Sequence, residues 1–327
     1  MTQEAKIGYS LGPLLSMNEV LAAARLADQA PSTHSIWVPE SWGRESFSTL
    51  GAASQVTSRC QLGTSIVSIY SRTPATVAMG AATLDMLSSG RTIVGLGAST
   101  EAIVSNWHGV KFEKPLARMR EFVSLVRAMT SGERVSYEGT FFNVSNFKLL
   151  HKPHRAKIPI FVGAVNNGMV SLASEIADGV IFFLRPLEEL KATARQLRQL
   201  TSGRAFEISC SIVCAVSDDF PEKARSRAAQ TLAFYVAVGT YYKKFLAATG
   251  FRQEVNKIGE AYSSGGVEQA AKAVPDRMLQ SLTICGTRAE CKESLRKFRE
   301  AGVTLPIIQF NPVESTESSF RELLSTF

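Results

Sequence analysis

The sequence predicts a (β/α)8 TIM barrel with insertions. Three observations support this fold: about eight short apolar runs, helix-like stretches between them, and a length of 327 residues. Several runs are apolar throughout rather than alternating, which is typical of strands buried on both faces of a parallel sheet. A doubly wound open sheet is the main alternative, but no Gly-x-Gly-x-x-Gly follows the first run. The expected strands are 6–10, 35–38, 61–67, 92–96, 158–163, 179–183, 207–216 and 304–310.

Helical patterns fill the segments between these strands. Residues 17–29 place Val20, Leu21, Ala24 and Ala27 on one stripe. Two further stretches begin with proline at a first-turn position and end just before a serine and glycine pair. The expected helices are 17–29, 47–57, 74–87, 115–129, 170–177, 186–200 and 288–301.

Two stretches are longer than a usual strand-to-helix connection. Residues 132–157 contain a predicted hairpin around Glu138-Gly139, and residues 221–281 have the pattern of several helices. We expect residues 1–327 to form a single barrel domain with a helical insertion at about 221–281. Aromatic residues at helical spacing in this insertion are typical of core or interface positions, with a substrate contact as the alternative: Tyr235, Tyr241, Tyr242, Phe245 and Phe251.

The composition is that of a globular protein, with 45% hydrophobic and 20% charged residues. No apolar run approaches the ~20 residues that span a bilayer, and the first residues lack the pattern of a signal peptide. These features predict a cytoplasmic protein without a membrane partner. The five cysteines match no metal-binding spacing, so we expect buried free thiols and no metal site.

The net charge of +7 leaves two interpretations open. The basic residues do not cluster with aromatic residues and form no recognised module, which argues against nucleic-acid binding. The excess charge indicates either an anionic small-molecule partner, such as a phosphorylated cofactor, or merely a basic surface.

Three strand ends rich in small or polar residues indicate a ligand pocket. They lie within 35–42, 62–74 and 90–99, and each precedes a helix-like stretch. In a parallel barrel the carboxyl ends of the strands form the open face, where ligands bind.

The segment Gly163-Ala-Val-Asn-Asn-Gly168 links a strand to a helix and is a candidate anion site. Amide groups at a helix amino terminus favour anions, and glycine allows close approach. An ordinary turn is the alternative, because Asn and Gly are common turn residues.

Two residues are candidate acid–base groups near the open face. Glu40 closes the second strand, where a carboxylate can relay a proton; a helix cap or an ion pair is the alternative. His108 lies beside Trp107, and a structural role is its alternative. Arg72, after the third strand, can meet a phosphate, a carboxylate or solvent.

The chain resembles the bacterial luciferase-like superfamily. Within it, the chain is most similar to the coenzyme F420-dependent oxidoreductases, the branch that includes methylene-tetrahydromethanopterin reductase. The similarity covers nearly the whole chain and is carried by phrases in a fixed order: Trp37-Val-Pro-Glu-Ser-Trp-Gly43, Tyr70-Ser-Arg-Thr-Pro74, Gly90-Arg91, Gly95-Leu-Gly-Ala-Ser99, Trp107-His-Gly109, Phe112-Glu-Lys-Pro115, Arg120-Glu121, Tyr137-Glu-Gly139, Ile158-Pro-Ile-Phe-Val-Gly163, Ala177-Asp-Gly179 and Ala301-Gly-Val303.

The resemblance implies a cofactor site at the barrel mouth. It places a bulge with a non-prolyl cis bond at Ser65–Ile66, and the phosphate part of the cofactor at the 163–168 loop. It also implies a homodimer or a larger homo-oligomer, for which helix 74–87 offers an apolar face. The implied cofactor-binding residues are Thr64, Ser65, Ile66, Ser68, Tyr70, Gly97, Ala98, Ser99, Gly163, Ala164, Asn166, Asn167 and Gly168.

The chain departs from the family pattern at four positions. Ser10 stands where methylene-tetrahydromethanopterin reductases tend to carry Glu, and Ser41 stands where some relatives have His. Thr100 and Glu101 replace a frequent Gly-Pro pair. The first difference weakens the assignment of a methylene-pterin substrate.

Three functions follow from the resemblance. The first is hydride transfer between F420 and a small organic substrate, with 5,10-methylenetetrahydromethanopterin or a related pterin as a candidate. The second is an FMN-dependent luciferase-like monooxygenase. The third is a flavin- or deazaflavin-binding protein without catalytic activity.

Overall fold

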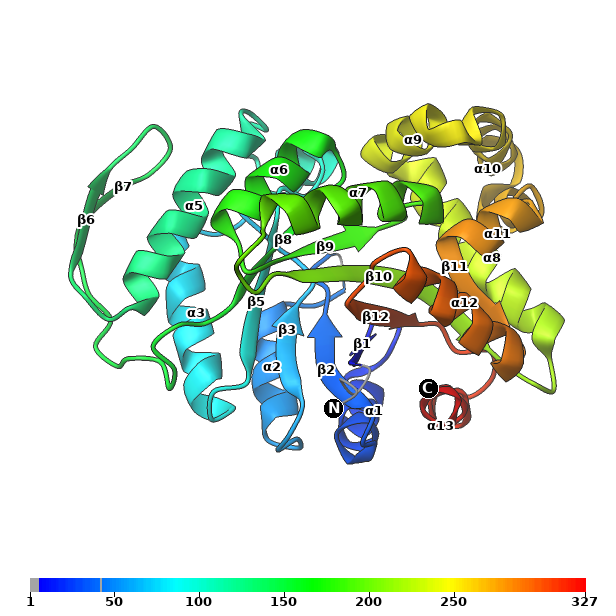
Figure 1. Ribbon diagram of the computed structural model, residues 1–327, viewed down its shortest axis with the longest axis horizontal. Coiled ribbons are helices and arrows are strands. Elements are labelled where there is room, and N and C mark those ends of the chain that lie inside the picture. Colours follow the sequence, from blue (N-terminus) through cyan, green and yellow to red (C-terminus); the bar gives the residue numbers. More distant parts are fainter. Residues whose placement is uncertain (1–5, 42) are drawn as a thin grey trace.

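Eight parallel strands close into a barrel in the computed structural model, which describes residues 6–41 and 43–327 (Figure 1). Strand β10 pairs with both β9 and β12, and this double pairing completes the ring. The predicted barrel is therefore confirmed and an open sheet is excluded. In ring order the strands are β1 (Ile7–Ser10), β2 (Thr33–Val38), β3 (Gln61–Thr64), β5 (Thr92–Gly97), β8 (Ile160–Gly163), β9 (Gly179–Phe183), β10 (Glu207–Val216) and β12 (Leu305–Phe310).

Large apolar side chains form a cluster among the barrel strands. The Trp37 indole is fully buried there, and its Nε1 donates to Ser35 Oγ at 2.8 Å. Glycine is required at Gly63 beside it, because a Cβ there would lie 2.3 Å from the Trp37 ring. The cluster consists of Trp37, Ile93, Phe161, Ile181, Leu305 and Ile307. With these side chains packed inside, ligands are left with the strand ends.

Helices surround the barrel and begin where the sequence supplies caps. Ser16 and Glu19 form a capping box at α1, and Pro74 and Pro115 occupy first-turn positions as expected. All seven predicted helices are present, whereas α4 and α13 were not predicted. The helices outside the insertion are α1 (Met17–Gln29), α2 (Ser46–Ser54), α3 (Pro74–Leu87), α4 (Glu101–Asn106), α5 (Pro115–Thr130), α6 (Asn167–Ile176), α7 (Leu187–Leu200), α12 (Arg288–Glu300) and α13 (Thr316–Thr326).

The two long connections project on opposite sides of the barrel in Figure 1. The predicted hairpin is present as β6 (Val135–Glu138) and β7 (Asn143–Phe147), an antiparallel pair next to α5. The other connection consists of helices with their own apolar cluster, followed by a short strand that extends the sheet beside β10. Its elements are α8 (Pro221–Val238), α9 (Thr240–Leu246), a π-helical turn (Ala247–Phe251), α10 (Arg252–Lys272), α11 (Asp276–Leu282) and β11 (Thr283–Gly286).

Some expectations concern residues outside the described ranges. They are the expected lack of a signal peptide, which involves residues 1–5, and Trp42 of the Trp37–Gly43 stretch. No helix within the described ranges combines the length and hydropathy needed to cross a bilayer. All five cysteines are free thiols, and Cys285 is half-buried whereas the other four are buried.

Candidate functional site

The third barrel strand is interrupted at the mouth of the barrel. The Ser65–Ile66 peptide bond is cis, as the resemblance implied, and it separates β3 from the two-residue strand β4 (Val67–Ser68). Thr64 anchors the interruption, because its Oγ1 accepts from Gly95 N and donates to Gly95 O, both at 2.8 Å. The Ser65 hydroxyl oxygen is buried and has no hydrogen-bond partner among the described residues.

The glycines at neighbouring strand ends make room for Ile66. A Cβ added at Gly97 would lie 2.6 Å from Ile66 Cδ1, and one at Gly163 would lie 3.3 Å from Ile66 Cγ2. The absence of a Cβ at these glycines therefore leaves room for the Ile66 side chain. Ile66 is only half-buried, so it forms part of the surface at this end of the barrel.

Tyr70 belongs to the wall of the mouth. Its backbone N–H donates to Ser68 Oγ at 3.2 Å, and its hydroxyl donates to Glu113 O at 2.8 Å. Its ring stacks on Phe112 with centroids 5.1 Å apart, and the Arg118 guanidinium lies 4.7 Å from its centroid. These contacts fix the segment that precedes α5 against the residues that follow β4.

Ala98 and Ser99 directly follow β5, and both are half-buried. Ser99 adopts a positive φ of 62°, and Thr100 Oγ1 then accepts from Ile103 N at 3.4 Å as the cap of α4. His108 follows α4 and is exposed. The structure does not include His108 in the ion-pair network that holds Glu40.

The predicted anion loop opens directly onto helix α6. Asn166 is the amino-terminal cap, and its Oδ1 accepts from Met169 N at 2.9 Å. Ala164 is buried and its N–H donates to Ile181 O, which ties the loop to β9. The amides of Asn167 and Gly168 have no acceptor within a helix that begins at Asn167, so this terminus has the donors that an anion needs.

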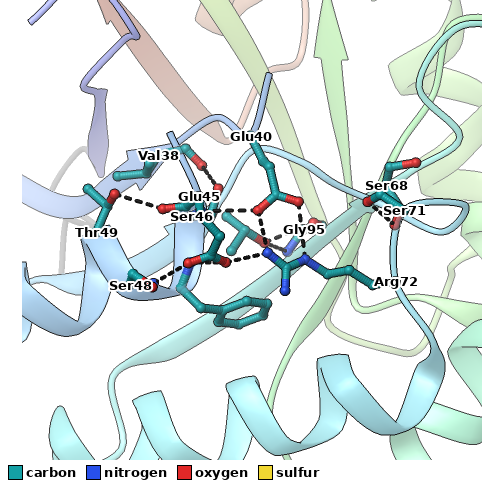
Figure 2. A network of polar contacts seen from close by, with 12 residues as sticks. Val38, Glu40, Glu45, Ser46, Ser48, Thr49, Ser68, Ser71, Arg72 and Gly95 are labelled. Atoms are coloured by element: carbon teal, nitrogen blue, oxygen red, sulfur yellow. Dashed lines mark hydrogen bonds and ion pairs between the residues drawn. The ribbon is translucent and has the colours of Figure 1, made fainter. Parts of the chain in front are cut away.

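Glu40 is part of an ion-pair network at the end of β2. Arg72 donates to it through both Nε (3.1 Å) and Nη2 (2.8 Å), and Ser46 N donates to Glu40 Oε2 at 3.1 Å (Figure 2). Arg72 also pairs with Glu45, and the side chains of Arg72 and Glu40 are 19% and 16% exposed. The ion pair and helix cap weighed as alternatives for Glu40 are therefore both present.

Two carboxylates cap α2 through this network. Glu45 accepts from the amides of Phe47 and Ser48, and Glu40 accepts from that of Ser46. Burial favours the neutral form of Glu45, but these amides and Arg72 outweigh it and lower the pKa of Glu45. The hydrogen bond to Glu40 raises the pKa of Arg72. The network therefore holds charged groups at the barrel mouth.

Comparisons with known proteins identify the family. A model of the luciferase-like monooxygenase family matches residues 2–305. The chain belongs to the luciferase-like monooxygenase family. It is 31% identical to a putative coenzyme F420-dependent oxidoreductase of Mycobacterium tuberculosis, over 94% of this chain and 96% of that protein.

Two further proteins that are similar to this chain have related names. The 5,10-methylenetetrahydromethanopterin reductase of Archaeoglobus fulgidus is 29% identical, with 91% of each chain covered. The structure of the coenzyme F420-dependent tetrahydromethanopterin reductase of Methanopyrus kandleri superposes with a TM-score of 0.88 at 21% identity, over 99% of this chain and 98% of that one. The predicted luciferase-like resemblance and barrel fold are thus confirmed.

The sequence reasoning missed several charged residues near this site. Arg118 lies over the rings of Tyr70, Phe141 and Phe142, and Arg185 is buried beside the 163–168 loop. The sequence contained one signal for Arg185, since Leu184-Arg185-Pro186 directly follows a predicted strand at the open face. Pro186 was interpreted only as the start of a helix, so the charged residue before it was not considered as part of the site.

Proposed function

We propose that this protein is an F420-dependent oxidoreductase that transfers a hydride between the deazaflavin and a small organic substrate. The observation that carries the proposal is the adjacency of two features at one end of the barrel. Ile66 forms a surface at the ends of β5 and β8, and the α6 amino terminus begins four residues after Gly163. A flat ring and a phosphate group on one cofactor need this pairing, and the coenzyme F420-dependent name of the Mycobacterium tuberculosis relative supports it.

The residues present fit such a cofactor. The Ser65 hydroxyl oxygen is buried and has no hydrogen-bond partner in the part of the chain that the structure describes, and the first-turn amides of α6 lack an acceptor within the helix. When bound, the deazaflavin supplies the carbon centre that accepts or donates the hydride. The proposed contacts are those implied by the resemblance: Thr64, Ser65, Ile66, Ser68, Tyr70, Gly97, Ala98 and Ser99 toward the ring, and Gly163, Ala164, Asn166, Asn167 and Gly168 toward the phosphate.

The protein's part in the reaction is chiefly orientation. Hydride moves directly between two carbon atoms, so holding them close and aligned supplies most of the rate. Glu40 and His108 are the proposed acid–base groups. Both oxygens of Glu40 already accept hydrogen bonds, so we expect this residue to aid proton movement without being indispensable.

A pterin is one candidate substrate among small hydride donors and acceptors. The reductase from Archaeoglobus fulgidus supports it, but the buried Ser10 at the end of β1 provides no carboxylate. An FMN-dependent monooxygenase is the second candidate function, favoured by the description of the matching family model.

An assay under anaerobic and aerobic conditions separates the two functions. Oxidised F420 is mixed with small alcohols, and reduced F420 with the methylene-pterin, while the absorbance of the deazaflavin is followed. Saturable, protein-dependent change in either direction supports the proposal. Oxygen consumption with reduced FMN, together with no reaction of F420, would establish the monooxygenase instead.

We also propose that the protein is a homodimer assembled through α3. This helix exposes Met79 (48%) and Met86 (40%), seven residues apart and therefore on one face, with Leu87 beside them (50%). Light scattering at micromolar concentration should give the mass of a dimer. Met79→Glu/Met86→Glu should yield monomers, whereas Met17→Glu on α1 should not. A monomeric wild-type protein contradicts this assembly.

A further inference from the structure

Arg185 is a buried arginine in the connection between β9 and α7. Only 2% of the residue is exposed, and it follows Leu184, whose φ of 49° turns the chain at the strand end. Its guanidinium carbon lies over two aromatic rings, 4.8 Å from the centroids of Phe182 and of Phe245 in α9. A guanidinium packed on aromatic rings keeps its N–H edges available for hydrogen bonding.

Only one edge of this guanidinium is used. Nη1 donates to Val165 O at 2.9 Å, whereas Nε and Nη2 are buried and have no partner within residues 6–41 and 43–327. Elsewhere in the chain the same two nitrogens bind a carboxylate, as in Arg72 with Glu40 and Arg155 with Asp85. Nε and Nη2 together form a fork that matches two oxygens of one carboxylate or phosphate.

The charge of Arg185 is not compensated by a hydrogen-bonded carboxylate. Burial lowers the pKa of Arg185, and the nearby charge of Glu189 raises it, yet a guanidinium stays protonated in proteins. A buried cation whose donors are unmet is strongly unfavourable. An anionic ligand at the fork would remove this penalty.

The surroundings of Arg185 also favour an anion. Its Nη1 contact is with Val165, in the loop that leads into α6, so the side chain lies beside that helix amino terminus. The helix dipole and the first-turn amides carry positive character at the same place. Phe245, half-buried on α9, lies against the same guanidinium and forms an aromatic wall of the site.

We propose that Arg185 binds an oxyanion, a phosphate or carboxylate group, through the fork of Nε and Nη2 beside the amino terminus of α6. The oxyanion comes either from the phosphate and glutamate tail of the cofactor or from an acidic substrate. The first source rests on the proposed function, whereas the binding of an oxyanion does not.

Three probes test this proposal: inorganic phosphate, intact F420, and the deazaflavin lacking phosphate and glutamate. Phosphate binding is measured as the rise in the thermal unfolding temperature over that in chloride at equal ionic strength. The affinity for each deazaflavin is measured by fluorescence titration. The variants are Arg185→Met, Arg185→Lys, which keeps the charge but not the fork, and Arg195→Met, which removes an exposed charge from α7. Circular dichroism checks the folding of each variant.

If the cofactor tail is the source, Arg185→Met weakens the binding of intact F420 by about 10–100-fold. It leaves the affinity for the tail-less deazaflavin unchanged. Intact F420 then also displaces phosphate. If an acidic substrate is the source, phosphate stabilises the F420-loaded protein, and Arg185→Met abolishes that stabilisation. In both cases the effect measured for Arg185→Lys lies between those of wild type and Arg185→Met. Arg195→Met binds F420 and responds to phosphate as wild type does.

Other outcomes separate this proposal from the proposed function. Arg185-dependent stabilisation by phosphate, without binding of either deazaflavin, supports the oxyanion site and contradicts the F420 proposal. The oxyanion site is wrong if phosphate does not stabilise wild type beyond chloride and Arg185→Met binds intact F420 normally. If Arg185→Met does not fold, Arg185→Lys and the wild-type phosphate shift decide the question.

Discussion

Replacing Gly163 by leucine should abolish saturable binding of the cofactor. Gly163 ends β8 at the barrel mouth, where an added Cβ already lies 3.3 Å from Ile66 Cγ2 and 3.6 Å from Leu96 O. A leucine side chain cannot fit there without displacing Ile66 or filling the approach to the α6 amino terminus. We expect the dissociation constant for F420 to rise by about 100-fold or more, equivalent to about 2.7 kcal/mol.

Matched variants separate this effect from general damage. Gly163→Ala adds only the Cβ and should weaken the binding of F420 by about 10-fold or less. Gly51→Leu is a control in α2, because the nearest heavy atom to its added Cβ is Leu87 Cδ1 at 3.9 Å, and it should bind F420 normally. Glu40→Gln should retain binding while kcat falls about 10–100-fold. An inactive Glu40→Gln variant, together with normal F420 binding by Gly163→Leu, would refute the proposal that the loop at Gly163 is essential for binding and that Glu40 only assists.

Replacing Arg72 by methionine should strongly destabilise the protein. It leaves Glu40 and Glu45 at the α2 amino terminus without the cation that lies between them (Figure 2). Removing one partner of a buried pair costs about 3–5 kcal/mol, and partial exposure reduces this to about 2–3 kcal/mol. The free energy of unfolding, measured in denaturant, reports this loss.

The pH dependence identifies the charges as the cause. The pKa of Glu45 is lowered in the folded protein, so its stabilising effect is present above the ordinary carboxyl pKa and is lost as pH falls through the lowered value. The difference between Arg72→Met and wild type should therefore be full near pH 7 and shrink only as pH falls below the ordinary carboxyl pKa of 4.5. Arg321→Met is the control, since its pair with Glu317 is 59% and 69% exposed and should cost under about 1 kcal/mol. Equal losses in the two variants would contradict this account.

The barrel could be predicted because its strands are buried on both faces. Apolar runs such as the one at Ile93–Leu96 carry that signal directly, and Pro74 and Pro115 mark helix starts. Helices α4 and α13 were missed for different reasons. The first has only six residues, and the second follows the last strand, where no further element was expected.

The site was less predictable because its geometry depends on contacts distant in sequence. The close approach of Ile66 to Gly97 joins residues 31 positions apart, and no local pattern predicts it. Glu40 and Arg72 were each considered alone, and only the fold shows that they pair across 32 positions. Arg185 gave almost no signal, since burial of a charged side chain is not visible in a short local pattern.

We expect the mouth of this barrel to bind a deazaflavin with an anionic tail. Binding is measured by fluorescence and absorbance titration with F420 and with FMN, at low and high salt. F420 should bind more tightly than FMN, and its binding should weaken as salt screens its tail. Equal affinities for the two cofactors, or an F420 affinity indifferent to salt, would contradict it.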